Sequence, residues 1–110
     1  MDYKKALEQI KEKYIVEDIG DDTCEIITRQ MLNDFNTSFL ALVKDENGCH
    51  LTDFAKTCEI VFIEDEMLKS LAKKHNLVFD DYYIKTPFNS MEDLNRFMEF
   101  FDDVAKSCED

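Results

Sequence analysis

The sequence predicts an α+β domain in which four helices pack on an antiparallel sheet of four to five strands. Apolar residues recur at helical spacing near both ends of the chain, whereas the middle holds short alternating runs rich in β-branched residues between polar turns. Only one proline and two glycines interrupt these runs. We therefore expect an N-terminal helix, two central helices and a C-terminal helix around the sheet.

The first thirty residues predict a helix followed by a hairpin. From Tyr3 to Tyr14 the apolar side chains share one helical face, and lysines occupy the other sides. Ile15–Ile19 alternates between apolar and acidic residues, Gly20-Asp21-Asp22 favours a turn, and Thr23–Met31 has the composition of a longer strand.

The next pair of strands should lie at the centre of the sheet. Ser38–Lys44 is mostly apolar on both alternating sides, which is typical of a central strand covered on both faces. Asp45-Glu46-Asn47-Gly48 predicts a tight turn, and Cys49–Thr52 the return strand.

Two central helices are expected after that hairpin. At the start of the first helix, the side chain of Thr52 or Asp53 can accept hydrogen bonds from the free backbone N–H groups. This helix should reach Phe62, although Ile60–Ile63 would also fit a strand. The second helix should run from Glu64 to Lys74, with acids in its first turn and lysines in its last. Asn76 suits a left-handed helix end.

The last third predicts β structure and a long helix. Leu77–Thr86 reads as a hairpin or a bent strand, because Asp80-Asp81 divides two apolar runs, and Pro87 ends it. Ser90 and Asp93 have the spacing of a capping box at the start of the final helix. Its apolar stripe, from Met91 to Cys108, is wide enough to leave a homodimer contact open.

The chain should form a single domain over residues 1–110, because no linker, repeat or low-complexity segment divides it. No apolar run approaches the roughly 20 residues that span a bilayer, so we expect a cytoplasmic protein without a membrane partner. The four cysteines lack any metal-binding spacing and are expected to be reduced, buried thiols, and we expect neither a metal nor a cofactor.

The formal charge of −12 is the strongest clue to function. Residues 15–36 hold six acids against one arginine, and residues 80–110 hold nine acids against three bases. Such a surface repels phosphates, which argues against nucleic acid and anionic membranes and permits a basic protein partner. The candidate partner-binding acids are Asp80, Asp81, Glu99, Asp102 and Asp103, with Asp18, Asp21 and Asp22 as a second patch.

A polar loop is the other candidate site. Asn33, Asp34 and Asn36 lie between two predicted strands, and Asp53 follows the next hairpin. Loops between strands often carry function, although Asn and Asp also form turns by bonding their own backbone.

Enzymatic chemistry has little support. The order of elements is similar to that of restriction-type nucleases, but their Glu-x-Lys motif is absent, and Asp34, Asp53 and Lys44 would make only a degenerate metal site. Neither His50 nor His75 lies in a nucleophile motif, and two glycines cannot build a phosphate-binding loop. We expect no enzyme activity.

A set of short motifs runs through the middle of the chain: Thr28, Leu32-Asn33-Asp34, Phe39 to Val43, Gly48, Leu51-Thr52-Asp53 and Thr57. In these positions the chain resembles a bacterial and phage family catalogued as domain of unknown function 1828, and the resemblance extends over about residues 23–105. The chain departs at Gln30-Met31, where the family tends to have Pro-Phe, and at Phe54-Ala55, where it tends to have Asp-Gly. The resemblance implies an origin in bacteria or their mobile elements and no assigned activity.

These observations favour a small acidic protein-binding domain that neutralises a basic, nucleic-acid-binding protein by mimicking nucleic acid. Nucleic-acid-mimicking inhibitors and some antitoxin or immunity proteins work in this way, and phage anti-defence proteins are the third type considered. The alternatives are a degenerate nuclease-like domain and a purely structural or oligomerisation domain.

Overall fold

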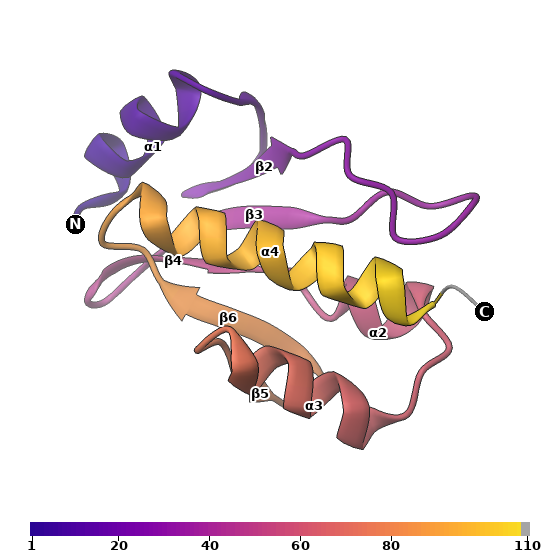
Figure 1. Ribbon diagram of the computed structural model, residues 1–110. Coiled ribbons are helices and arrows are strands. Elements are labelled where there is room, and N and C mark those ends of the chain that lie inside the picture. The colour runs from indigo at the N-terminus through magenta and orange to yellow at the C-terminus, as the bar shows by residue number, and fades with distance from the viewer. Residues whose placement is uncertain (109–110) are drawn as a thin grey trace.

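The computed structural model describes residues 1–108 and confirms the α+β class (Figure 1). The sheet is antiparallel and has six strands, more than the four to five expected, in the order β1-β2-β3-β4-β6-β5. The strands are β1 (Ile15–Gly20), β2 (Thr23–Ile27), β3 (Leu40–Asp45), β4 (Gly48–Thr52), β5 (Val78–Asp80) and β6 (Tyr83–Pro87). The helices are α1 (Tyr3–Lys11), α2 (Lys56–Ile60), α3 (Asp65–Lys74) and α4 (Met91–Ser107).

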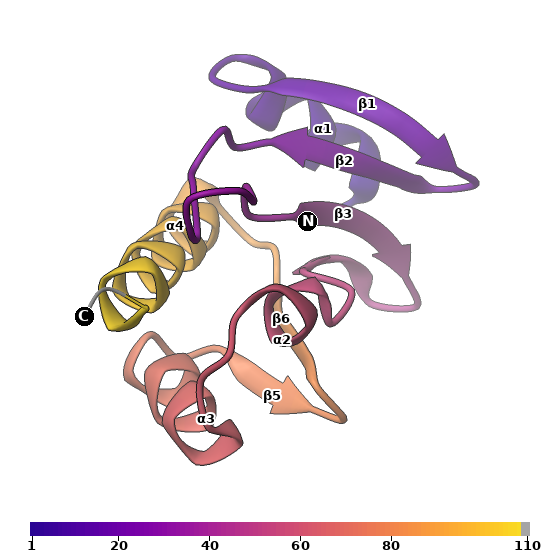
Figure 2. The ribbon, with the colours of Figure 1, turned by 90° about the vertical axis from the view of Figure 1, so that its right-hand side faces the viewer.

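One face of the sheet carries the main helices. Cys24, Leu42, Leu51 and Thr86 are paired in register from β2 to β6, so their buried side chains share this face. Helices α3 and α4 lie against it, and α2 lies at one end of the strands (Figures 1 and 2). The side chains of α1 join the same core.

The opposite face is more open, so the expectation that β3 is covered on both faces holds at Ala41, which is fully buried, and not at Val43. β3 is central, as expected, but Val43 and its neighbours across the sheet are only half-buried on this face. Three aromatic rings pack together at one end of this face. The ring centroid of Phe54 lies 6.1 Å from that of Phe39 and 6.4 Å from that of Tyr83.

Local chemistry fixes the helix ends. Ser90 and Asp93 form the expected capping box at the start of α4, where the Asp93 carboxylate accepts from the Ser90 N–H at 3.1 Å. α3 ends with two lysines, and Asn76 adopts the expected left-handed conformation with φ of 57°. The Asp2 carboxylate caps α1 by accepting from the Lys5 N–H at 2.9 Å.

Several elements are shorter than the sequence predicts. α1 ends at Lys11, and α2 has only five residues. β2 ends at Ile27 and not at Met31, because Arg29 has a φ of 57° and leaves the extended region. The open choice between a hairpin and a bent strand is settled as a hairpin, because Asp81 and Tyr82 turn the chain between β5 and β6.

The apolar stripe of α4 lies inside the core. Phe97, Phe100 and Phe101 are fully buried and their ring centroids are 5.2 to 6.0 Å apart. Most of the stripe therefore packs within the chain, whereas Met91, Met98 and Ala105 are half-buried. Cys24 and Cys49 are buried, as expected, whereas Cys58 and Cys108 are half-buried. Within residues 1–108 no helix has the length and apolar character needed to cross a membrane.

Candidate functional site

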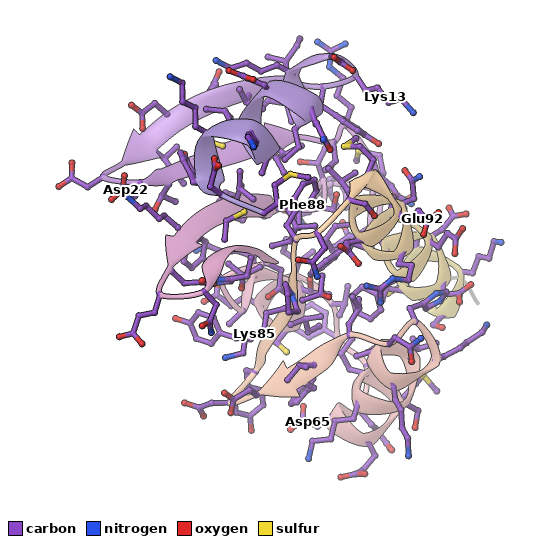
Figure 3. The ribbon with its side chains drawn as sticks, turned by 90° about the vertical axis from the view of Figure 1, so that its left-hand side faces the viewer. Lys13, Asp22, Asp65, Lys85, Phe88 and Glu92 are labelled. Carbon is purple, nitrogen blue, oxygen red and sulfur yellow. The ribbon has the colours of Figure 1, made fainter. Side chains whose placement is uncertain are left out.

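The turn between β1 and β2 gathers the acids Asp18, Asp21 and Asp22 at one end of the sheet. β1 and β2 pair in register until a bulge between Asp18 and Gly20, after which Asp22 has a φ of 53° and reverses the chain. The Asp18 carboxylate accepts from the Gly20 N–H at 3.4 Å. Figure 3 shows Asp22 at the outer end of this hairpin. We call these three residues the hairpin acids.

The hairpin acids border a groove between α1 and the hairpin. The groove has a volume of about 550 Å³, and its other lining includes Leu7 and Val16 as apolar walls and Lys11 as a cation. Apolar walls beside carboxylates match the two parts of a lysine or arginine side chain, whose stem is apolar and whose end is charged.

Two ionisable side chains that line the groove, Tyr3 and Cys24, are uncharged near pH 7. Tyr3 and Cys24 hydrogen-bond through their side chains, and burial is the main reason that the pKa of each is raised. Both groups are therefore neutral near pH 7, and Cys24 lacks the thiolate that nucleophilic chemistry requires.

The hairpin acids have no counter-ion within the described part of the chain. No lysine, arginine or histidine nitrogen among residues 1–108 lies within 4.0 Å of their carboxylates. Their exposed charges form no direct ion pair, although Lys11 lines the same groove, and they can therefore attract a cationic partner.

The other predicted acidic patch is divided between two places. Asp80 and Asp81 lie at the β5–β6 turn, whereas Glu99, Asp102 and Asp103 lie on α4, and Figure 2 shows these two regions on different sides of α3. The structure therefore does not bring the five acids together into one surface.

Most of these five acids also have cationic neighbours within the chain. Asp80 pairs with Lys85 at 3.1 Å, and Asp102 lies 4.0 Å from Lys106. Glu99 lies 3.9 Å from His75. Internal pairing leaves less charge for a partner here than at the hairpin acids.

Asp103 has two close basic neighbours, more than any other of these five acids. His75 lies 2.6 Å and Lys74 3.0 Å from its carboxylate. The hydrogen bond with His75 is the largest cause that lowers the pKa of Asp103, and the hydrogen bond from Lys74 is the next. The contact joins α4 to the end of α3, so its evident role is structural.

The polar loop is mainly a set of turn contacts. The Asn33 side chain accepts from the N–H groups of Phe35 and Asn36 at 2.9 Å, and it donates to the Ile60 carbonyl at 3.3 Å. Asn33 therefore attaches the loop to the end of α2. Asp34 and Asn36 are exposed beside it.

Asp53 is fully buried and holds the backbone of three segments. Its carboxylate accepts from the N–H groups of Ala55 and Ile84 at 2.9 Å and of Thr57 at 3.3 Å. Burial raises the pKa of Asp53 although these hydrogen bonds oppose the shift.

The structure separates Lys44 and Asp53, two of the three residues considered for a degenerate nuclease site. Lys44 pairs with Cys49 at one end of the β3–β4 ladder, whereas Asp53 follows Thr52 at the other end. Among the described residues no group of three or more histidine, cysteine or acidic side chains is placed to hold a metal ion.

No family model, curated protein or solved structure matches the chain.

The structure contains further features that sequence patterns did not single out. Each histidine faces an aspartate, with His50 2.6 Å from Asp45 as well as the His75 pair. Phe35 and Phe62 are 91% and 99% exposed on loops that the Asn33 contact joins. Only the loop position of Phe35 could have indicated its exposure, whereas Phe62 lay in a segment predicted to be helical.

Proposed function

We propose that this chain is a small acidic binding domain that neutralises a basic protein through the hairpin acids and the adjacent groove. The observation that carries the proposal is that Asp18, Asp21 and Asp22 form no ion pair with any of residues 1–108, whereas most of the acids in the other predicted patch are paired internally. Carboxylates placed in this way can occupy the positions where a nucleic-acid-binding protein receives phosphates.

The groove supports the same proposal. Leu7 and Val16 offer apolar contact to the stem of a lysine or arginine, and Asp18 offers a carboxylate to its charged end. A partner would gain both packing and charge neutralisation there. Together with the resemblance to a family of bacteria and mobile elements, this favours an inhibitor of the antitoxin, immunity or phage anti-defence type.

A charge-reversal experiment tests this function with a twenty-residue poly-L-lysine probe at low ionic strength. The triple variant Asp18→Lys, Asp21→Lys, Asp22→Lys should weaken binding by about tenfold or more, because attraction between opposite charges becomes repulsion. Binding by the unchanged chain should also weaken as salt screens the charges.

The matched control is the triple variant Asp80→Lys, Asp81→Lys, Asp102→Lys, which changes the net charge by the same amount. It should retain most of the binding, since two of its three acids are already paired. Equal losses in the two variants would show that only net charge matters, and would contradict a dedicated site at the hairpin.

A further inference from the structure

We propose that β1 is the docking edge for an extended basic segment of the partner, which joins the sheet as a seventh strand beside β1. This inference rests on the proposed function and specifies how the partner binds.

The two edges of the sheet differ in their readiness to accept a strand. β5 has only three residues and packs against α3. β1 has six residues and forms the other edge, and Figure 2 shows no helix or strand of residues 1–108 beyond its outer side. An edge strand presents N–H and C=O groups that another strand can bind, and proteins usually shorten or cover such an edge. β1 is neither short nor covered.

The side chains of β1 define the segment that would fit. Ile15 and Ile19 are 57% and 47% exposed, and Glu17 and Asp18 between them are also exposed. A docked strand would place its side chains about 5 Å from these residues. Glu17 lies on the same face of β1 as Ile15, and Asp18 lies on the other face. A lysine or arginine opposite Glu17 would therefore meet its carboxylate with the charged end and cover Ile15 with the apolar stem.

A repulsive pair on β1 and β2 supports a cationic occupant. Glu17 lies directly opposite Glu25, and neither has an ion-pair partner among residues 1–108. Burial and then the charge of Glu17 raise the pKa of Glu25. Like charges in facing positions destabilise a sheet, and a cation from a docked strand would relieve the repulsion.

The same acids disfavour a second copy of this chain as the occupant. Two β1 strands paired with each other would bring Glu17 and Asp18 of both copies close together, which adds like-charge repulsion. A basic strand suffers no such penalty. The charge of β1 therefore selects against self-association and for a lysine- or arginine-bearing partner.

Two labelled peptides test the strand geometry by fluorescence anisotropy with the full chain. The first is a ten-residue peptide of alternating valine and lysine, and the second carries N-methyl groups on its four central residues. The methyl groups keep the charge and remove the backbone donors. The unmodified peptide should bind and slow hydrogen exchange of the β1 amides, and N-methylation should weaken binding by about tenfold or more.

The variant Glu17→Lys provides a test that does not depend on weakened folding. It should lose most peptide binding, yet its thermal stability should equal or exceed that of the unchanged chain because the Glu17 and Glu25 repulsion is gone. The control Glu64→Lys makes the same charge change on an exposed residue before α3 and should retain binding.

The outcomes separate this inference from the proposed function. Equal binding of the two peptides, with β1 exchange unchanged, would overturn strand addition, while a loss on reversing the hairpin acids would still support the proposed function. Absence of binding to both peptides and to poly-L-lysine would overturn both proposals.

Discussion

The carboxylate of Asp53 accepts a 2.9 Å hydrogen bond from the N–H of Ile84, a residue 31 positions further along the chain. The Asp53 N–H in turn donates to the Ile84 carbonyl at 3.1 Å. Because the carboxylate also accepts from the start of α2, one buried side chain joins the end of β4 to β6 and to that helix.

Replacing this carboxylate should have an effect that depends on pH in an unusual direction. The pKa of Asp53 is raised in the folded state, so its contribution to stability is present below the unfolded value and is lost as pH rises through the folded value. Asp53→Asn should destabilise the fold by about 1–3 kcal/mol. Urea denaturation should show a smaller loss at pH 7 than at pH 4.

Asp93→Asn is the control, because the pKa of Asp93 is lowered in the folded state whereas that of Asp53 is raised. Burial opposes ionisation of Asp93, but hydrogen bonds from Asn89, Arg96 and Ser90 prevail and lower its pKa. Its contribution is therefore present above the unfolded value and is lost as pH falls through the folded value, so this variant should lose more stability at pH 7 than at pH 3, which lies below the ordinary aspartate pKa. The same trend for both variants would contradict the assignment for Asp53.

Ala55→Gly should stabilise the protein. Ala55 has a φ of 61° and follows Phe54 with a φ of 51°, a conformation that costs energy for a residue with a Cβ. Relief of this strain should exceed the added chain entropy and give about 0.5–1 kcal/mol, measured as a rise in Tm. The control Ala105→Gly lies inside α4 and should lower Tm.

Phe97→Ala should cost about 3–5 kcal/mol, because it opens a cavity in the fully buried aromatic group of α4. Denaturant unfolding measures the loss, and Phe97→Leu should recover part of it. A cost below about 1 kcal/mol would mean that the three phenylalanines do not form the centre of the core.

Phe62→Ser should leave the unfolding midpoint almost unchanged, within about 0.5 kcal/mol. Its ring is 99% exposed and contributes little burial to the folded state. The variant should instead reduce binding of a hydrophobic dye at the surface. A large stability loss would contradict the exposed position of this side chain.

Short-range chemistry explains what the sequence predicts well. The Ser90 and Asp93 capping box, the left-handed Asn76 and the charge order along α3 each involve residues within a few positions, and each appears as expected. The central place of β3 follows from its apolar run, because burial of such a run requires neighbours on both edges.

The errors arise where the backbone adopts conformations that residue types do not announce. Arg29 and Tyr82 both have positive φ, although neither type favours it. The early end of β2 was therefore not predictable, and the sequence could not decide between a hairpin and a bent strand for β5 and β6. The internal pairing of Asp103 joins residues 28 positions apart in sequence, so charge counting could not separate it from the unpaired hairpin acids.

Strand order has a consequence for the kinetics of folding. The pairs β1–β2, β3–β4 and β5–β6 close over short turns, whereas β4 and β6 meet only after α2, α3 and β5 have been spanned. Closing a long loop carries a larger entropic barrier than closing a turn. We therefore expect three hairpins to form early and the joint between β4 and β6, fastened by Asp53, to determine the rate at which the native state appears.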